Sequence, residues 1–298
     1  MTETKFVFDD AAAYERYMGR WSRPIAALFV RWLGVPDGGA WLDVGCGTGA
    51  LSQTILATAN PRLVIGCERS AGYVDTARRS TDDPRAQFIV AMPNEAPSTE
   101  GGFDAAVSGL VLNFLADPVD ALGVMRRRTR PGGVVGSYVW DYSRGMEMLR
   151  IFWDEAVALD PAAGARDERR MPLCRQGELT ALWRAHNLRD VSEEALAIQT
   201  VFSSFDDYWS PFLGQQGPAG AYVATLAAND RERLRRGLRR RLQGDNGDGP
   251  IVMSARAWAV RGRTPWSRQP NAGKRQSLRA ERLHGVDPRG AACRQVAR

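Results

Sequence analysis

The sequence lacks a long apolar run and a cysteine pair, and each absence excludes a class of protein. No apolar stretch approaches the ~18 to 20 residues that cross a bilayer, so we expect no membrane span. The first ten residues carry mixed charges without an apolar core, unlike a secretory signal. The four cysteines lie far apart with no C-x-x-C pair, which favours buried free thiols over disulfides or a metal site. We therefore expect a soluble, cytoplasmic protein without a bound metal.

Lysine is almost absent, and the positive charge is concentrated at one end. Lys5 and Lys274 are the two lysines, and arginine supplies the other basic residues. Residues 264–298 hold eight Arg or Lys and two Asp or Glu, which accounts for the whole net charge of +6. Residues 1–263 are formally neutral, so we expect no nucleic-acid partner. The arginine-rich segment 231–241 has a leucine every four residues, which predicts an amphipathic helix with a solvated face.

From residue 40 to 140, short apolar runs alternate with helical patterns. Helices are expected at 51–59, 72–79 and 117–128, between runs that read as buried strands. The runs are Trp41–Val44, Arg62–Cys67, Gln87–Val90, Phe103–Ser108 and Val134–Trp140. This alternation predicts a parallel sheet with helices on both faces.

After Trp140 the pattern changes. Helices are predicted at 145–159 and 178–186, and strands at 191–202 and 251–260. Residues 205–243 read as mostly helical and rich in aromatic side chains. From Thr264 onward no period remains, and we expect a disordered basic tail.

The first apolar run leads into a glycine-rich turn, Asp43-Val44-Gly45-Cys46-Gly47-Thr48-Gly49. Glycines let the backbone approach a ligand closely, and the following helix offers unpaired N–H groups at its start. Glu68 ends the second apolar run, where a carboxylate can accept hydrogen bonds from ribose hydroxyls. A nucleoside-like ligand is therefore expected at this turn.

The glycine-rich turn resembles the first motif of the class I S-adenosylmethionine-dependent methyltransferases, D/E-x-G-x-G-x-G. The resemblance implies that Gly45, Cys46, Gly47 and Gly49 wrap the methionyl part of S-adenosyl-L-methionine, with Asp43 near its ammonium group. Gly45-x-Gly47-x-x-Ala50 also satisfies the looser dinucleotide pattern. An NAD(P)-dependent oxidoreductase therefore stays an alternative.

Two further stretches are similar to later motifs of the same family. Phe103–Leu112, which includes Ser108, resembles the fourth-strand motif, and Arg130-Pro131-Gly132-Gly133 resembles the turn before the fifth strand. The segment Tyr14–Ser22 is similar to the N-terminal helix of the ubiquinone/menaquinone-biosynthesis-like branch. That likeness implies that Tyr14 and Arg20 approach the carboxylate of the cofactor.

One position departs from the family pattern. The family places Gly-Asp-Ala after the third strand, where the aspartate accepts a hydrogen bond from the adenine amino group. Here the corresponding residues are Ala91, Met92 and Pro93. Met92 lacks a carboxylate and Pro93 lacks an N–H, so these cofactor-binding positions differ chemically from the family. A methyltransferase-fold binding protein with weakened catalysis therefore stays a second alternative.

The sequence names no methyl acceptor and no clear base. His186 sits near the end of a predicted helix, and Asn113 stands where related sequences place a histidine. Asp141, just after the fifth strand, is a weak candidate for a catalytic base. Two interpretations stay open for a set of aromatic residues, which either wall an apolar acceptor pocket or pack in the core: Trp140, Phe152, Trp153, Tyr208, Trp209 and Phe212.

Together these features predict an α/β fold. It has a Rossmann-like seven-stranded methyltransferase sheet, whose last strand is antiparallel, with helices on both faces. We expect a domain over 1–263 with a helical lid at 1–39, a cofactor-binding core at 40–140 and acceptor-side insertions at 141–263. The expected function is methyl transfer from S-adenosyl-L-methionine to a small-molecule acceptor.

Overall fold

The chain enters the sheet at β1 (Ala40–Val44), and all five residues of this strand are buried. β1 pairs in parallel with β2 (Leu63–Glu68) on one side and with β4 (Phe103–Gly109) on the other. A parallel strand covered on both faces carries an unbroken apolar run, which explains the sequence pattern here. Because β1 is central, the residues that follow it lie at the middle of one edge of the sheet.

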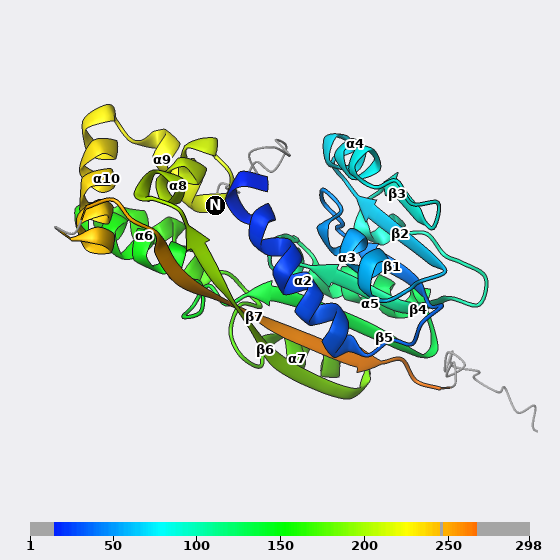
Figure 1. The fold of residues 1–298 in the computed structure, drawn as a ribbon. Helices are drawn as coiled ribbons and strands as arrows, with labels where there is room; N and C mark the ends of the chain where they lie inside the picture. Colours follow the sequence, from blue (N-terminus) through cyan, green and yellow to red (C-terminus); the bar gives the residue numbers. More distant parts are fainter. Residues whose placement is uncertain (1–14, 245–246, 267–298) are drawn as a thin grey trace, which may run out of the picture. The chain divides into compact units, whose positions relative to one another are not determined.

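Seven strands form one sheet in the order β3-β2-β1-β4-β5-β7-β6 (Figure 1). β3 (Ala86–Val90) and β5 (Thr129–Trp140) continue the parallel pairing. β7 (Ile251–Arg263) pairs antiparallel with both β5 and β6 (Arg189–Phe202). The predicted seven-stranded sheet with an antiparallel last strand is confirmed.

The computed structural model describes residues 15–244 and 247–266, which belong to one compact unit ending at Trp266. Tyr14 and residues 267–298 of the predicted tail lie outside the described residues. Within the described part of the chain, no helix combines the length and apolarity that a membrane crossing requires.

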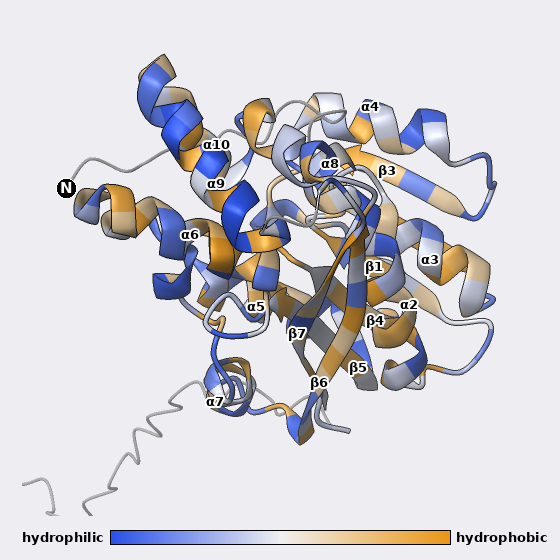
Figure 2. Ribbon diagram, turned by 60° about the vertical axis from the view of Figure 1, so that its left-hand side comes forward, coloured by the Kyte–Doolittle hydropathy of each residue, from blue (hydrophilic) through white to orange (hydrophobic). Residues whose placement is uncertain are grey.

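Helices cover both faces of the sheet (Figure 2). α2 (Arg20–Leu33) and α3 (Ala50–Thr58) lie side by side on one face, and α4 (Ala71–Ser80) follows beside β3. α5 (Pro118–Arg128) and α7 (Glu178–Ala185) cover the other face. The apolar side of α2 packs through Phe29, whose ring centroid lies 4.6 Å from that of Tyr138.

Two boundaries differ from the sequence prediction. The expected turn at Arg130–Gly133 lies inside β5, as a register irregularity in which Phe103 pairs with Thr129 but Ala105 pairs with Val134. Gly132 has a φ of 71°, which lets the extra residues loop out of the ladder. The folded part also continues past Arg263, since the Thr264 hydroxyl donates to the Arg130 carbonyl at 2.5 Å.

β6 and β7 are longer than their neighbours. β5 pairs with β7 only from Ala257 to Arg263, whereas β6 and β7 stay paired to Phe202 and Ile251. The two strands therefore extend as a ribbon beyond the carboxyl end of β5. Helices follow this ribbon and form what we call the cover (Figure 1), namely α6 (Glu147–Leu159), α8 (Phe205–Trp209), η6 (Ser210–Gly214), α9 (Gly217–Thr225) and α10 (Ala228–Gln243).

The cover has an aromatic core, as the sequence composition indicates. The rings of Phe152 and Phe212 stack at 4.5 Å, and Tyr208 contacts Phe212 edge-on at 5.5 Å. Phe152 and Trp153 from α6 both meet Tyr222 from α9. Short turns join the larger elements, namely η1 (Glu15–Gly19), η2 (Pro93–Glu95), η3 (Leu112–Phe114), η4 (Pro161–Arg166) and η5 (Glu168–Arg170).

Truncating Phe212 tests whether this core holds the cover together. Phe212 is fully buried, so Phe212→Ala leaves a cavity and should lower the free energy of unfolding by about 3–5 kcal/mol. Leu213→Ala is the matched control, because this neighbour is 49% exposed and should cost less than ~1 kcal/mol. Urea unfolding followed by tryptophan fluorescence measures both changes. Equal effects of the two substitutions would contradict the packing described.

Candidate functional site

The glycine-rich turn follows β1 directly and has a backbone that favours glycine. Gly45 and Gly47 have φ values of 75° and 55°, in the left-handed region. A Cβ at Gly45 would lie 2.7 Å from a methyl carbon of Val111, so no larger residue fits there. The N–H groups of Gly45 and Cys46 both donate to the Cys67 carbonyl, at 2.8 and 3.1 Å. The turn is thus fixed against the end of β2.

Asp43 lies in β1, two residues before Gly45, and is fully buried. Its Oδ2 accepts a 2.7 Å hydrogen bond from the Ser52 hydroxyl on α3, while Oδ1 has no partner among the described residues. Burial raises the pKa of Asp43 to about 7; the Ser52 hydrogen bond opposes this shift and the charge of Glu68 adds to it. A buried carboxylate oxygen without a partner is costly, and a cationic ligand group would relieve that cost.

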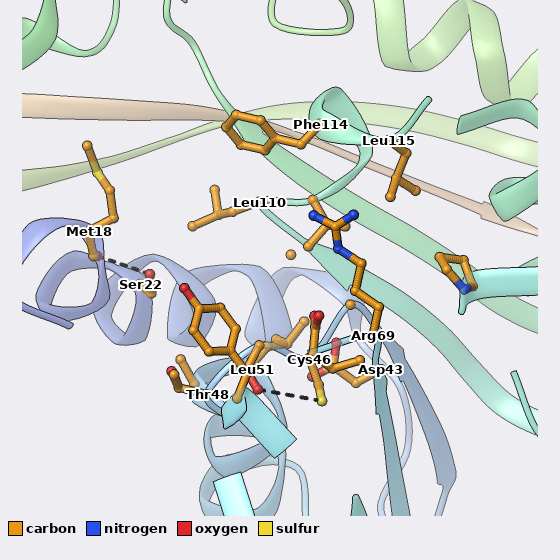
Figure 3. Close-up of a pocket in the computed structure, with 18 of the residues that line it drawn as sticks. Met18, Ser22, Asp43, Cys46, Thr48, Leu51, Arg69, Leu110, Phe114 and Leu115 are labelled. Carbon is orange, nitrogen blue, oxygen red and sulfur yellow. Dashed lines mark hydrogen bonds between the residues drawn. The ribbon is translucent and has the colours of Figure 1, made fainter. Parts of the chain in front are cut away.

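A cavity of about 260 Å³ opens at the carboxyl ends of β1, β2, β4 and β5 (Figure 3). Seven of the predicted residues line it: Asp43, Gly45, Cys46, Gly47, Glu68, Met92 and Pro93. Glu68 ends β2 half-buried, and its Oε1 accepts the Ser70 N–H at 2.9 Å. In Figure 3 the Arg69 side chain extends toward Leu110 and Leu115. Ligands of open α/β sheets bind at this edge.

Met92 and Pro93, the two residues that depart from the family pattern after the third strand, both line the cavity. Met92 is 47% exposed and lies at the cavity beside Pro93, which opens η2. The nearby carboxylate of Glu95 accepts the Met92 N–H at 3.1 Å, so it closes this turn. The structure therefore presents a thioether and a proline ring where the family pattern has a carboxylate and an N–H.

Arg20 lies elsewhere than the resemblance implies. It is absent from the cavity lining, and its guanidinium pairs with Asp207 of α8 at 2.7 Å. The same group sits over the rings of Trp21 and Phe202, at 4.5 and 4.7 Å. Arg20 thus joins α2 to the cover in this structure, and its contact with a cofactor carboxylate stays a prediction. Tyr14, its predicted companion, is outside the described residues.

Gly49 and Ser108 stand behind the cavity and do not line it. Gly49, with a φ of 93°, caps the start of α3. Ser108 is fully buried in β4, and its carbonyl accepts the Ser137 hydroxyl at 2.7 Å. Gly49 thus shapes the start of α3 and Ser108 the end of β4, and their contact with a cofactor stays a prediction.

Asp141 is structural in this fold. Its Oδ2 pairs with Arg256 of β7 at 2.5 Å, and its Oδ1 accepts from the Ser143 hydroxyl and the Arg144 N–H. Burial raises the pKa of Asp141, but these hydrogen bonds and the Arg256 charge outweigh burial and leave the pKa below its usual range. Asp141 is also absent from the cavity lining. A paired carboxylate with a lowered pKa is a poor base, so the structure gives no support to a catalytic role for Asp141.

The cavity lining includes Trp140, one of the aromatic residues expected at an acceptor pocket, and also Tyr17 and Glu168, which the sequence did not single out. Glu168 is 2% exposed, and burial raises its pKa to about 8. In the sequence it stands in Arg166-Asp167-Glu168-Arg169-Arg170, which reads as a solvated charged loop. Only the packing of η5 against α6 and α9 turns this carboxyl inward, so no local pattern could have identified it.

The N-terminal turn closes one side of the cavity. Tyr17 and Met18 of η1 line it, and the Thr48 hydroxyl of the glycine-rich turn donates to Glu15 at 2.6 Å. Tyr17 also contacts Phe212 of the cover edge-on at 6.0 Å. The glycine-rich turn and the cover are therefore bridged by the same short segment.

Curated relatives match only part of the chain. An uncharacterized 37.1 kDa protein in transposon TN4556 of Streptomyces fradiae is 34% identical over 124 residues, covering 40% of this chain and 36% of the relative. A ribosomal protein L11 methyltransferase of Burkholderia orbicola is 36% identical over 121 residues, covering 39% and 37%. The chain thus spans little more than a third of the length of these relatives.

A solved structure shows the same fold over most of the chain. The Haemonchus contortus phosphoethanolamine N-methyltransferase 2, in complex with phosphomonomethylethanolamine and S-adenosylhomocysteine, is 17% identical with a TM-score of 0.52. The match covers 86% of this chain and 57% of that one. Residues 42–136 also match the family model described as a methyltransferase domain. The ubiquinone/menaquinone-like branch stays a prediction. The glycine-rich turn and the central strands of the sheet thus lie within the region that matches a methyltransferase domain.

Proposed function

We propose that the protein transfers a methyl group from S-adenosylmethionine to a small, partly apolar acceptor by in-line displacement. One observation carries this proposal: the cavity beside the glycine-rich turn holds a buried carboxylate, Asp43, with an unpartnered oxygen. An amino-acid ammonium group is the natural complement to such an oxygen. The cofactor, when bound, supplies a methyl group made electrophilic by its sulfonium.

The residues present fit the methionyl and ribose parts of such a cofactor but not its adenine part. Asp43 Oδ1 would meet the ammonium group, and Gly45 and Gly47 allow the backbone to approach the methionyl chain. Glu68 would accept hydrogen bonds from ribose hydroxyls. Its Oε1 accepts the Ser70 N–H, and a carboxylate can accept about four hydrogen bonds. At the adenine end Met92 and Pro93 offer apolar contact in place of hydrogen bonds.

That weak end favours a second candidate, a methyltransferase-fold binding protein with reduced catalysis. Each missing adenine contact costs roughly 1–3 kcal/mol, or about 5- to 150-fold in affinity. The residues that fit the methionyl and ribose parts of the cofactor outweigh the change at the adenine end. Methyl transfer therefore remains the preferred function.

A small acceptor is supported by the size and enclosure of the cavity. Its volume of about 260 Å³ is near the lower end of the roughly 300–1,000 Å³ of small-molecule sites. Residues of η5 and α9 also line it, so the cover limits access by a large partner. Arginines of α10 are paired with carboxylates, for example Arg235 with Asp206 and Arg241 with Asp154. Their charge is therefore largely neutralised, which argues against a nucleic-acid partner.

Calorimetric titration tests the cofactor directly. We expect S-adenosylmethionine and S-adenosylhomocysteine to bind with Kd values of ~1–100 μM, and NAD to give no binding heat. Asp43→Asn should weaken both sulfur nucleosides about 10- to 100-fold, because a charge-assisted hydrogen bond is lost. NAD binding without either sulfur nucleoside would refute the proposal.

Asp104→Asn is the matched control for Asp43→Asn. Asp104 also lies on a central strand, but near the start of β4, where Arg130 pairs with it at 2.6 Å. Affinity should stay within about twofold of the unchanged protein, since the cavity is at the opposite end of the strands. A loss as large as that of Asp43→Asn would point to a general structural effect.

Restoring the missing carboxylate tests the adenine end. Met92→Asp should tighten S-adenosylhomocysteine binding by about 5- to 150-fold, because the new carboxylate accepts from the adenine amino group. Met92→Ala serves as the control and should leave affinity equal or slightly lower. Calorimetry measures all three proteins. An unchanged Kd for Met92→Asp would mean that adenine is held elsewhere in the cavity.

A further inference from the structure

Polar side chains from η1, β5 and η5 are among those that line the cavity. Tyr17 comes from η1, Trp140 ends β5, and Glu168 begins η5. All three line the cavity and are nearly inaccessible, with exposed fractions of 3%, 2% and 2%. β4 separates β5 from β1 in the sheet, so Trp140 lies on the side of the cavity away from β2 and its Glu68.

Two of these groups lack hydrogen-bond partners. The Tyr17 hydroxyl and the Trp140 indole N–H have none among the described residues. Burying such a group unpaired costs roughly 1–3 kcal/mol. Apolar side chains line the same cavity, including Met18 and Phe114. Folding therefore leaves two polar groups unsatisfied beside a ligand-sized space, which is the arrangement expected of a binding subsite.

Glu168 is held rigidly and still has free accepting capacity. Its Oε2 accepts from the Trp153 indole N–H of α6, and its Oε1 accepts the Ala219 N–H of α9 at 3.3 Å. A carboxylate can accept about four hydrogen bonds, so capacity remains for a ligand. Because two elements of the cover fix its position, the carboxyl cannot turn away to solvent.

Glu168 also borders a second cavity of about 330 Å³. Phe114, Glu168 and Pro218 line both cavities, and Asn113 and Met171 line the second alone. A proton gained by Glu168 on the first side can therefore leave through the second. That route is useful only if the carboxyl changes its protonation state during a reaction.

We propose that Glu168 is the general base for a hydroxyl acceptor with a flat apolar body, such as a phenol. This inference rests on the proposed methyl transfer from S-adenosylmethionine. A hydroxyl both donates and accepts, so it can donate to Glu168 while accepting from the Tyr17 hydroxyl or the Trp140 N–H. An ammonium group cannot accept, and would leave these two donors unsatisfied. The aromatic lining suits a flat ring.

The step balances without another reactant. The hydroxyl oxygen forms a bond to the methyl carbon, and the electron pair of the broken C–S bond stays with sulfur. The hydroxyl proton passes to the Glu168 carboxylate and from there to solvent. The net result is a methyl ether, neutral S-adenosylhomocysteine and one released proton.

The charges around Glu168 set how its activity should vary with pH. Asp167 and Arg169 flank it and pair with each other at 2.5 Å, and Tyr17 is close enough for the Glu168 charge to raise its pKa further. Burial, the largest cause, raises the pKa of Glu168 to about 8. Since a base must be deprotonated, the rate should rise as pH increases through that value and level off above it.

Matched naphthalene compounds test the acceptor class. With S-adenosylmethionine present, release of S-adenosylhomocysteine is measured for 2-naphthol, 2-(aminomethyl)naphthalene and 2-naphthoic acid. We expect 2-naphthol to react at least about tenfold faster than the other two. Glu168→Gln should lower kcat for 2-naphthol by about 10²- to 10³-fold and abolish the rise of the rate near pH 8. Glu194→Gln, an exposed residue of β6, should change neither.

Binding supplies a readout that does not require turnover. Calorimetry with the S-adenosylhomocysteine-loaded protein should show 2-naphthol binding, weakened about tenfold by Glu168→Gln and several-fold by Tyr17→Phe. S-adenosylhomocysteine itself should bind the variants unchanged, which shows that they are folded. The proposal is overturned if 2-naphthol does not bind, if the amine reacts faster, or if Glu168→Gln keeps both kcat and the pH profile. If S-adenosylhomocysteine does not bind to the protein without substitutions, the proposed function itself is refuted.

Discussion

The buried carboxylate of Asp43 is the constraint on which the site depends. It lies in the central strand β1 with no exposure, and Ser52 satisfies only one of its oxygens. Burial of a charge is tolerated when another partner completes the pairing, so the fold holds this oxygen ready for a cation. The positive φ angles of Gly45 and Gly47 keep the following backbone out of that space. Strand, turn and carboxylate thus form one unit.

The acceptor side is built from segments distant in sequence. The β6–β7 ribbon carries the cover beyond the carboxyl end of β5, and η1 reaches both regions through Glu15 and Tyr17. Arg20 strengthens the same connection by pairing with Asp207. The aromatic core packs the cover together, and Trp153 of α6 holds the Glu168 carboxyl beside the cavity. In the proposed function, the sheet would bind the cofactor and the cover would bind the acceptor.

Local sequence indicated the residues that gather around the glycine-rich turn because their pattern is local. Asp43, the glycines and Glu68 follow two adjacent parallel strands, so their placement results from strand order alone. Arg20, Ser108 and Asp141 have partners that local sequence does not indicate, namely Asp207, the Ser137 hydroxyl that donates to the Ser108 carbonyl, and Arg256. Glu168 escaped prediction for the same reason, since its environment comes from α6 and α9.

The most direct test of the account is proton release when S-adenosylhomocysteine binds. The pKa of Asp43 is near 7 in the free protein, and an ammonium partner should lower it, so binding near pH 7 should release a fraction of a proton. Calorimetry at pH 7 in two buffers of different ionisation enthalpy measures this number. The account predicts net release that disappears in Asp43→Asn, and affinity that rises with pH through about 7. Binding without proton release, or release unchanged in Asp43→Asn, would contradict it.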